Sequence, residues 1–170
     1  MQITGDADVP IANEIMNSAD RTAAILATSW LDEYLTSAIK SWLVNDKDTS
    51  HKLLKPSGPI GALAVKAELG YLLGMYTVRA RDDIVHISGI RNFFAHWTKT
   101  IDFGSRDIRT KCESLQTYDF VWSSSFPDMQ IPKPFTRENA RKLFLETVSL
   151  SVNFLHSIRT HADKRMTYGW

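Results

Sequence analysis

The sequence predicts an all-α protein, most simply a helical bundle of about five to seven helices. Three observations support this prediction: long stretches lack both glycine and proline, apolar residues recur at spacings of three and four, and strand patterns are nearly absent. With 170 residues, of which 44% are hydrophobic, the chain has the size of one domain and the composition of a folded protein. We therefore expect a single helical domain over residues 1–170.

The first long helix is expected over residues 18–44, which contain neither glycine nor proline. Ser18 is placed to cap it by accepting hydrogen bonds from first-turn amides, and Asp20 suits the positive end of the helix dipole. The expected buried face consists of Ala27, Trp30, Leu31, Tyr34, Leu35, Ala38, Ile39, Trp42 and Leu43.

Four shorter helices are expected in the middle of the chain. The first covers residues 46–54 and stops at the Pro-Ser-Gly-Pro turn of 56–59, and the second covers 60–75. The third runs from Val78 to Phe94 or slightly beyond, and the fourth follows Ser105 as its cap. The inward residues of this last helix are Ile108, Cys112 and Leu115.

The two final segments differ sharply from each other. Residues 116–135 hold three prolines, a serine triplet and scattered aromatic residues, so we expect a loop that packs on the body of the protein. Residues 136–162 predict a long C-terminal helix with a broad apolar face, which Thr136 is placed to cap.

Composition excludes several classes of protein. The formal net charge is +1, with 20 Lys and Arg against 19 Asp and Glu, so no overall basic field points to nucleic acid. The single cysteine, Cys112, excludes an intrachain disulfide and a zinc site of several cysteines. The histidines have no metal-site spacing, and no apolar stretch reaches the roughly 18 residues of a membrane span. Residues 1–10 lack the pattern of a signal peptide, so we expect a cytoplasmic protein without a metal or another cofactor.

Arg91, Asn92 and His96 are the candidates for chemistry, because they join a guanidinium, a carboxamide and an imidazole within six residues. Arginine binds phosphate in a planar fork, and histidine moves protons near neutral pH. These groups would suit metal-independent RNA cleavage, in which a base removes the 2′-OH proton and a cation stabilises the phosphorane. On a regular helix Arg91 and His96 are about 140° apart, so they converge only if the helix loosens near Ala95 or a second subunit faces the site.

This Arg-x4-His spacing resembles the signature of the HEPN superfamily, and the resemblance implies a helical bundle that acts as an endoribonuclease, often as a dimer. In that case Arg91 would hold the scissile phosphate, His96 would act as general base or acid, and Asn92 would orient the transition state. The alternative is structural: Arg91 pairs with an acid, Asn92 caps or bridges helices, and His96 satisfies the helix end.

A wider resemblance, to the mannitol operon repressor family, rests on four blocks in the right order. Asp-Arg-Thr-Ala-Ala at 20–24 with Leu-Asp-Glu at 31–33 looks like the family's opening, and Gly-Pro-Ile-Gly-Ala-Leu at 58–63 is similar to its Gly-Pro-Leu-Gly turn. Ile-Arg-Asn-Phe-Phe-Ala-His at 90–96 matches its Ile-Arg-Asn-x-Phe-Ala-His block, and the Ile-Asp-Phe at 101–103 continues the pattern.

This family-like core spans residues 18–115, and Thr22 stands where the family usually has glycine. The resemblance implies an all-helical bacterial transcriptional regulator, a repressor that lowers expression of a sugar-alcohol uptake operon. It supplies no DNA-reading element. The chain agrees, because the best basic cluster, at the C-terminal end (Arg159, His161, Lys164 and Arg165), suits a helix end, and Arg79 and Arg81 are neutralised by Asp82 and Asp83.

Asp20, Arg21, Asp32 and Glu33 are candidate orienting or partner-binding residues. A carboxylate hydrogen-bonded to Arg91 or His96 would fix the geometry of the motif. The alternative is an ordinary interhelical salt bridge.

We therefore expect a non-enzymatic regulator that binds a regulatory protein partner, with nucleic acid left open as a second kind of partner. The competing hypothesis is a HEPN-type endoribonuclease or toxin that uses Arg91 and His96. Four tryptophans exceed what a small bundle is expected to bury, which favours a homodimer. They are Trp30, Trp42, Trp97 and Trp122.

Overall fold

The computed structural model describes residues 8–123 and 136–162, and the regular elements in these ranges are helices, without strands. This confirms the all-α bundle and adds two helices, one near the N-terminus and one after residue 116, to the six segments that the sequence analysis placed. In chain order the helices are α1 (Val9–Asn17), α2 (Asp20–Trp42), α3 (Lys47–Leu54), α4 (Leu63–Leu72), α5 (Val78–His96), α6 (Arg106–Glu113), α7 (Thr117–Ser123) and α8 (Arg137–Ala162). Within the described ranges no helix combines the length and apolarity needed to cross a membrane.

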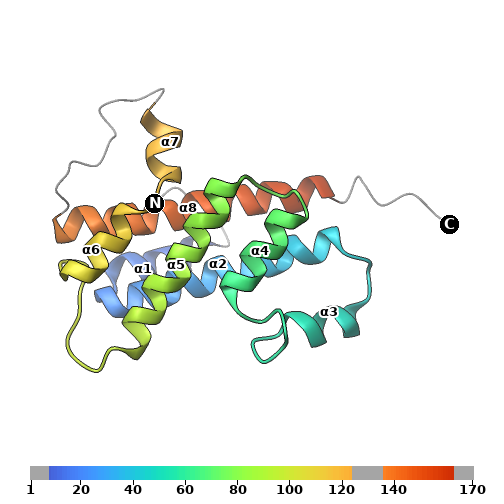
Figure 1. Ribbon diagram of the computed structural model, residues 1–170, viewed down its shortest axis with the longest axis horizontal. Coiled ribbons are helices and arrows are strands. Elements are labelled where there is room, and N and C mark those ends of the chain that lie inside the picture. Colours follow the sequence, from blue (N-terminus) through green and yellow to red (C-terminus); the bar gives the residue numbers. More distant parts are fainter. Residues whose placement is uncertain (1–7, 124–135, 163–170) are drawn as a thin grey trace.

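The two long helices α2 and α8 pack against each other, and α5 crosses both of them obliquely (Figure 1). A chain of phenylalanine rings marks the centre of the core: Phe94 of α5 lies 5.0 Å from Phe103, which lies 5.3 Å from Phe144 of α8. All three side chains are fully buried. Most of the predicted face of α2 is buried as well, so the three-and-four spacing identified the core correctly.

The N-terminal helix α1 is absent from the sequence-based expectation, and its presence changes the role of Ser18. Ser18 has an extended backbone and ends α1: its Oγ donates to the carbonyl of Glu14 at 2.7 Å and its backbone N–H donates to that of Ile15. The prediction that Ser18 caps the long helix is therefore wrong. That helix begins two residues later, at Asp20.

The expectation of a loop over residues 116–135 is wrong for its first part, where α7 forms. Asp83 of α5 is 1% exposed, and its carboxylate accepts hydrogen bonds from the backbone amides of Gln116 and Thr117 at 2.7–3.2 Å. These amides start α7 and would otherwise lack partners. The rest of the predicted loop, residues 124–135, lies outside the described residues.

The predicted cap of α8 forms, whereas the predicted cap of α6 is wrong: Ser105 precedes α6, but its side chain makes no hydrogen bond to the helix amides and donates to Oδ1 of Asp102 at 3.2 Å instead. Asp46 caps α3 by accepting from the amide of Thr49 at 2.9 Å, and Thr136 caps α8 by accepting from that of Asn139 at 3.2 Å. A Cβ on Gly58 would lie 2.6 Å from the carbonyl oxygen of Lys52, so the turn closes too tightly against α3 for any side chain.

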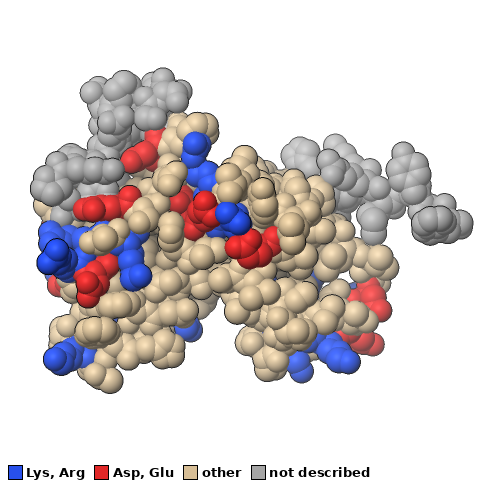
Figure 2. Space-filling model, viewed as in Figure 1, with Lys and Arg blue, Asp and Glu red and all other residues tan. Residues whose placement is uncertain are grey.

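The structure confirms the expected burial of Cys112 and a part of the expected exposure of the tryptophans. Cys112 is fully buried, and this burial, with a smaller effect of Glu113, raises the pKa of its thiol to about 12, as expected for an inert thiol. The predicted exposure of tryptophan holds for Trp97, which is 44% exposed, but Trp30 is buried and donates to Asp8. On the face shown in Figure 2, acidic and basic side chains are interspersed between broad uncharged areas.

Candidate functional site

The three residues of the candidate catalytic motif do not converge within one chain. Helix α5 stays regular through His96, so Arg91 and His96 lie about 140° apart around its axis. Arg91 is half-buried and donates from Nη1 to the side-chain oxygen of its neighbour Asn92 at 3.1 Å. His96 is exposed at the last residue of the helix. The helix is therefore not loosened near Ala95, so Arg91 and His96 do not meet in that way. That the two residues meet across a facing second subunit stays a proposal.

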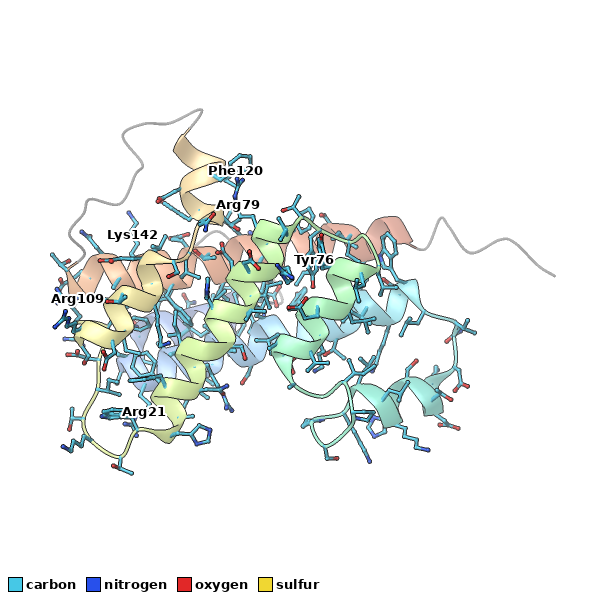
Figure 3. All side chains as sticks on the ribbon, viewed as in Figure 1. Arg21, Tyr76, Arg79, Arg109, Phe120 and Lys142 are labelled. Carbon is cyan, nitrogen blue, oxygen red and sulfur yellow. The ribbon has the colours of Figure 1, made fainter. Side chains whose placement is uncertain are left out.

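Of the four candidate orienting residues, Arg21 contacts the chain that directly follows α5. Figure 3 shows it beside the lower end of that helix. Its Nη2 atom donates to the backbone carbonyls of Trp97 at 2.8 Å and Lys99 at 2.9 Å. Arg21 therefore fixes the chain that follows His96 and satisfies carbonyls at a helix C-terminus.

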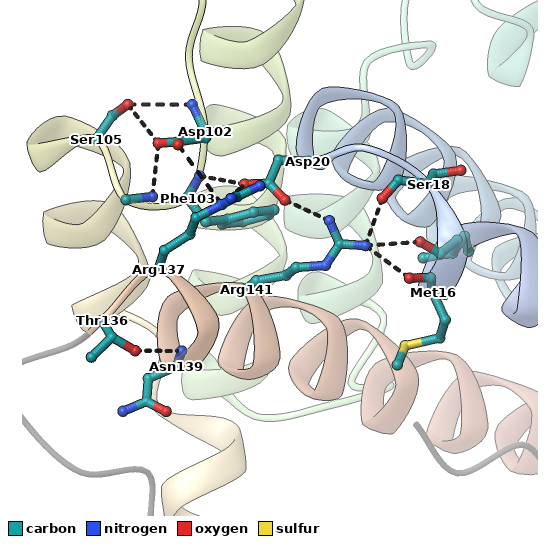
Figure 4. A network of polar contacts seen from close by, with 12 residues as sticks. Met16, Ser18, Asp20, Asp102, Phe103, Ser105, Thr136, Arg137, Asn139 and Arg141 are labelled. Carbon is teal, nitrogen blue, oxygen red and sulfur yellow. Dashed lines mark hydrogen bonds and ion pairs between the residues drawn. The ribbon is translucent and has the colours of Figure 1, made fainter.

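Asp20 lies at the centre of a polar junction between helix ends (Figure 4). Its side chain is 4% exposed. Oδ2 accepts from the amide of Phe103 at 2.9 Å and from Nε of Arg137 at 2.8 Å, and Oδ1 accepts from Nη1 of Arg141 at 2.6 Å. We call Asp20, Phe103, Arg137 and Arg141 the polar junction.

Arg141 extends the polar junction to α1. Its Nη2 donates to the carbonyls of Ile15, Met16 and Ser18 at 2.9–3.2 Å. These carbonyls lie at the C-terminal end of α1, where a helix leaves carbonyls without intrahelical partners. One guanidinium therefore ties the end of α1, the start of α2 and the body of α8 together.

The protonation of Asp20 reflects these contacts. Burial alone would raise the pKa of its carboxyl, but hydrogen bonds from Arg137, the amide of Phe103 and Arg141 outweigh that effect. The pKa is held below its ordinary value of 3.8, so the carboxylate is charged at neutral pH. A carboxylate with both oxygens occupied by its own chain is suited to holding the fold rather than to accepting a proton from a substrate.

Asp32 forms an interhelical salt bridge, which is the structural alternative that the sequence analysis left open. Both of its oxygens accept from Nζ of Lys66 of α4, at 2.8 and 2.9 Å. Lys66 is 2% exposed, whereas Asp32 is 32% exposed. The pair is an interhelical salt bridge that joins α2 to α4, beside a hollow of about 400 Å³ that exposed Glu33 and His51 also line. The structure therefore places Asp32 with Lys66 of α4 and Asp20 with Arg137 and Arg141 of α8.

The sequence interpretation of Arg79 and Arg81 as a neutralised helix start is correct for one of them. Arg81 pairs with Asp82 at 2.7 Å and with Glu68 at 3.1 Å. Arg79 lies over the ring of Phe120 in α7, with its guanidinium carbon 3.9 Å from the ring centroid. Nothing in the sequence pointed to this contact, because residues 117–123 were not expected to form a helix and the two residues are far apart in the chain.

Comparisons with known proteins give one informative result. No family model matches the chain, and no curated protein matches it by sequence. A solved structure, the X-ray structure of the MtlR–HPr complex from Escherichia coli, contains a chain of similar fold, with a TM-score of 0.61 and 18% sequence identity. The match covers 86% of this chain and 98% of that one. The resemblance to the mannitol operon repressor inferred from four sequence blocks is thus confirmed at the level of the fold, and this chain folds as MtlR does.

Proposed function

We propose that this protein is a bacterial transcriptional regulator of the mannitol-repressor type, which acts by binding another protein and has no catalytic activity. The observation that carries this proposal is the fold match over 98% of a chain of the MtlR–HPr complex. Because MtlR is seen there with HPr, the first partner to test is the HPr of the organism from which this chain comes.

The described charges support binding rather than catalysis. Asp20 and Asp32 are occupied by Arg137, Arg141 and Lys66 of the same chain. The charges on the visible face are mixed in sign, as in Figure 2, rather than gathered into the basic stripe that a DNA-reading surface needs. Regulation through a protein partner accounts for both features.

The direct test is calorimetric titration of the full-length protein with purified HPr. We expect a saturable isotherm and co-elution on size exclusion, with an unrelated protein of similar size and charge as the negative control. Deletion of the gene should raise transcription of a sugar-alcohol uptake operon. Absence of binding at about 100 μM of each protein, which corresponds to an interaction weaker than roughly 5–6 kcal/mol, would contradict the proposal.

A second arm addresses the nuclease hypothesis. The purified protein is incubated with structured and single-stranded RNA in EDTA, beside the His96→Ala and Arg91→Ala variants. We expect no cleavage by any of them. Cleavage that the parent shows and both variants lose by 10²-fold or more would make the protein a ribonuclease and would contradict the absence of catalysis. Light scattering during size exclusion tests the homodimer that such a nuclease would need.

A further inference from the structure

An apolar groove of about 870 Å³ lies between the start of α5, α7 and α8. Its floor is buried: Met75, Ile84 and Leu155 are at most 5% exposed. Its rim is formed by large apolar side chains that face solvent, namely Val78, Phe120 and Phe154, which are 47–59% exposed. A concave apolar surface with a buried floor, in the size range of about 300–1,000 Å³, is typical of small-molecule sites.

Arg79 supplies the charge at the edge of this groove (Figure 3). It is half-buried and contacts the ring of Phe120, and within the described parts of the chain it has no carboxylate partner. Arg81, two residues on, is paired with both Asp82 and Glu68. The two arginines in the first turns of this helix thus differ: among the described residues Arg81 has carboxylate partners and Arg79 has none, so the guanidinium of Arg79 can pair with an external anion.

One wall of the groove is rigid. The hydroxyl of Tyr76 donates to the carbonyl of Ala67 at 2.8 Å, and the ring fits into a notch at Gly70. A Cβ at Gly70 would lie 2.7 Å from Cζ of Tyr76, so this notch exists only because residue 70 is glycine. A wall held by packing and a hydrogen bond needs little reorganisation when a ligand binds.

The volume of the groove and the single cation in its described lining favour a compact ligand with one charge. The lining of the groove spans residues 78–84 of α5, 117–121 of α7 and 150–155 of α8. The remaining side is closed by the turn at 74–77.

We propose that this groove binds a small amphiphile that has an apolar chain and a single carboxylate. The carboxylate pairs with the guanidinium of Arg79 at the edge, and the chain lies on the floor formed by Met75, Ile84 and Leu155 between the rings of Phe120 and Phe154. The proposal is argued from the groove and from Arg79, and it does not rest on the function proposed above.

The test is calorimetric titration of the full chain with octanoate and decanoate below their micellar concentrations and with 1-decanol below its solubility limit. Decanoate should bind on the order of tenfold more tightly than octanoate, since it buries two more methylenes. Arg79→Gln should weaken decanoate about tenfold or more and leave decanol unchanged, because only the carboxylate forms a charge-assisted hydrogen bond. Phe154→Ala should weaken both ligands.

Arg81→Gln is the matched control, since it removes the same charge from the same helix outside the groove, and it should not change decanoate binding. Circular dichroism confirms that each variant is folded. The proposal is overturned if decanoate fails to bind the folded parent, if decanol binds as tightly as decanoate, or if the two arginine variants weaken binding equally. Saturable binding of an acidic amphipathic peptide that Arg79→Gln and Phe154→Ala both weaken, with no binding of decanoate, would identify the groove as a protein-docking surface and would also overturn the proposal.

Discussion

The polar junction and the apolar groove use the same type of residue in opposite ways. At the junction Arg141 donates to one buried carboxylate and to three backbone carbonyls. At the groove Arg79 contacts one aromatic ring and no carboxylate among the described residues. The difference arises because the junction is built from helix ends, which leave carbonyls without partners, whereas the groove is built from apolar helix faces that no other described helix covers. Arg141, at the helix ends, therefore stabilises the fold. Arg79, beside an apolar surface that no other described helix covers, can bind a ligand.

The largest effect is expected at the centre of the junction. Asp20→Ala removes the acceptor of three hydrogen bonds and leaves the amide of Phe103 and the guanidinium of Arg141 without it. We expect a loss of about 3 kcal/mol or more in the free energy of unfolding, measured in urea. A loss under about 1 kcal/mol would contradict the difference described between the polar junction and the groove, because the polar junction would then contribute little to the stability of the fold.

The pH dependence of stability tests the same carboxylate independently. Because the pKa of Asp20 is lower in the folded state than its ordinary value of 3.8, its contribution is present above that value and is lost as the pH falls from there through the folded pKa. The stability difference between the parent and Asp20→Asn should be constant above about pH 5 and should shrink below about pH 4. A difference that grows on acidification would contradict the hydrogen bonding described for Asp20.

The salt bridge between Asp32 and Lys66 should respond asymmetrically. Asp32→Ala leaves a buried ammonium group without its partner and should cost about 2 kcal/mol or more. Lys66→Met leaves Asp32, which is about one-third exposed, in contact with water and should stay within about 1 kcal/mol of the parent. Equal losses in the two variants, measured by thermal unfolding, would show that the pair itself, rather than burial of the ammonium group, controls the cost.

A smaller and more local effect is expected at Arg21. Arg21→Ala removes two hydrogen bonds to the carbonyls of Trp97 and Lys99, worth about 1 kcal/mol in total at this half-buried position. Hydrogen exchange should accelerate in residues 96–102 and stay unchanged in α8. Uniform acceleration over the whole chain would indicate global destabilisation instead of a loosened segment after α5.

The smallest effect is expected for His96. Because its side chain is exposed at a helix end, His96→Ala should change the free energy of unfolding by no more than about 0.5 kcal/mol. The same variant should bind decanoate as the parent does, since the groove lies at the other end of α5. A loss above about 1 kcal/mol would reveal packing that makes His96 part of the fold.

The sequence predicted the fold well, because the three-and-four spacing of apolar residues reports directly which face of a helix is buried. It predicted both ends of α2, α5 and α8 to within two residues. It missed α1 and α7, which are nine and seven residues long. Short helices of this kind are held by tertiary contacts such as Asp83 with the amides of residues 116 and 117, and a local pattern does not contain those contacts.

The candidate site was less predictable for a related reason. The sequence singled out Asp20, Arg21 and Asp32 as residues of interest but did not supply their partners, which lie 34 to 121 residues away. Arg137 and Arg141 carried no signal at all, since a single arginine in an amphipathic helix is ordinary. Arg79 looked neutralised because two acids follow it closely, yet one of these, Asp83, points inward and caps α7.

The most direct test of the difference between junction and groove is the free energy of unfolding of two matched variants, Arg141→Gln and Arg79→Gln, in urea at neutral pH without ligand. We predict that Arg141→Gln loses about 2 kcal/mol or more, because buried acceptors lose their donor. Arg79→Gln should stay within about 0.5 kcal/mol of the parent. Equal losses in the two variants would contradict the account, because Arg79 would then be held by the fold as firmly as Arg141.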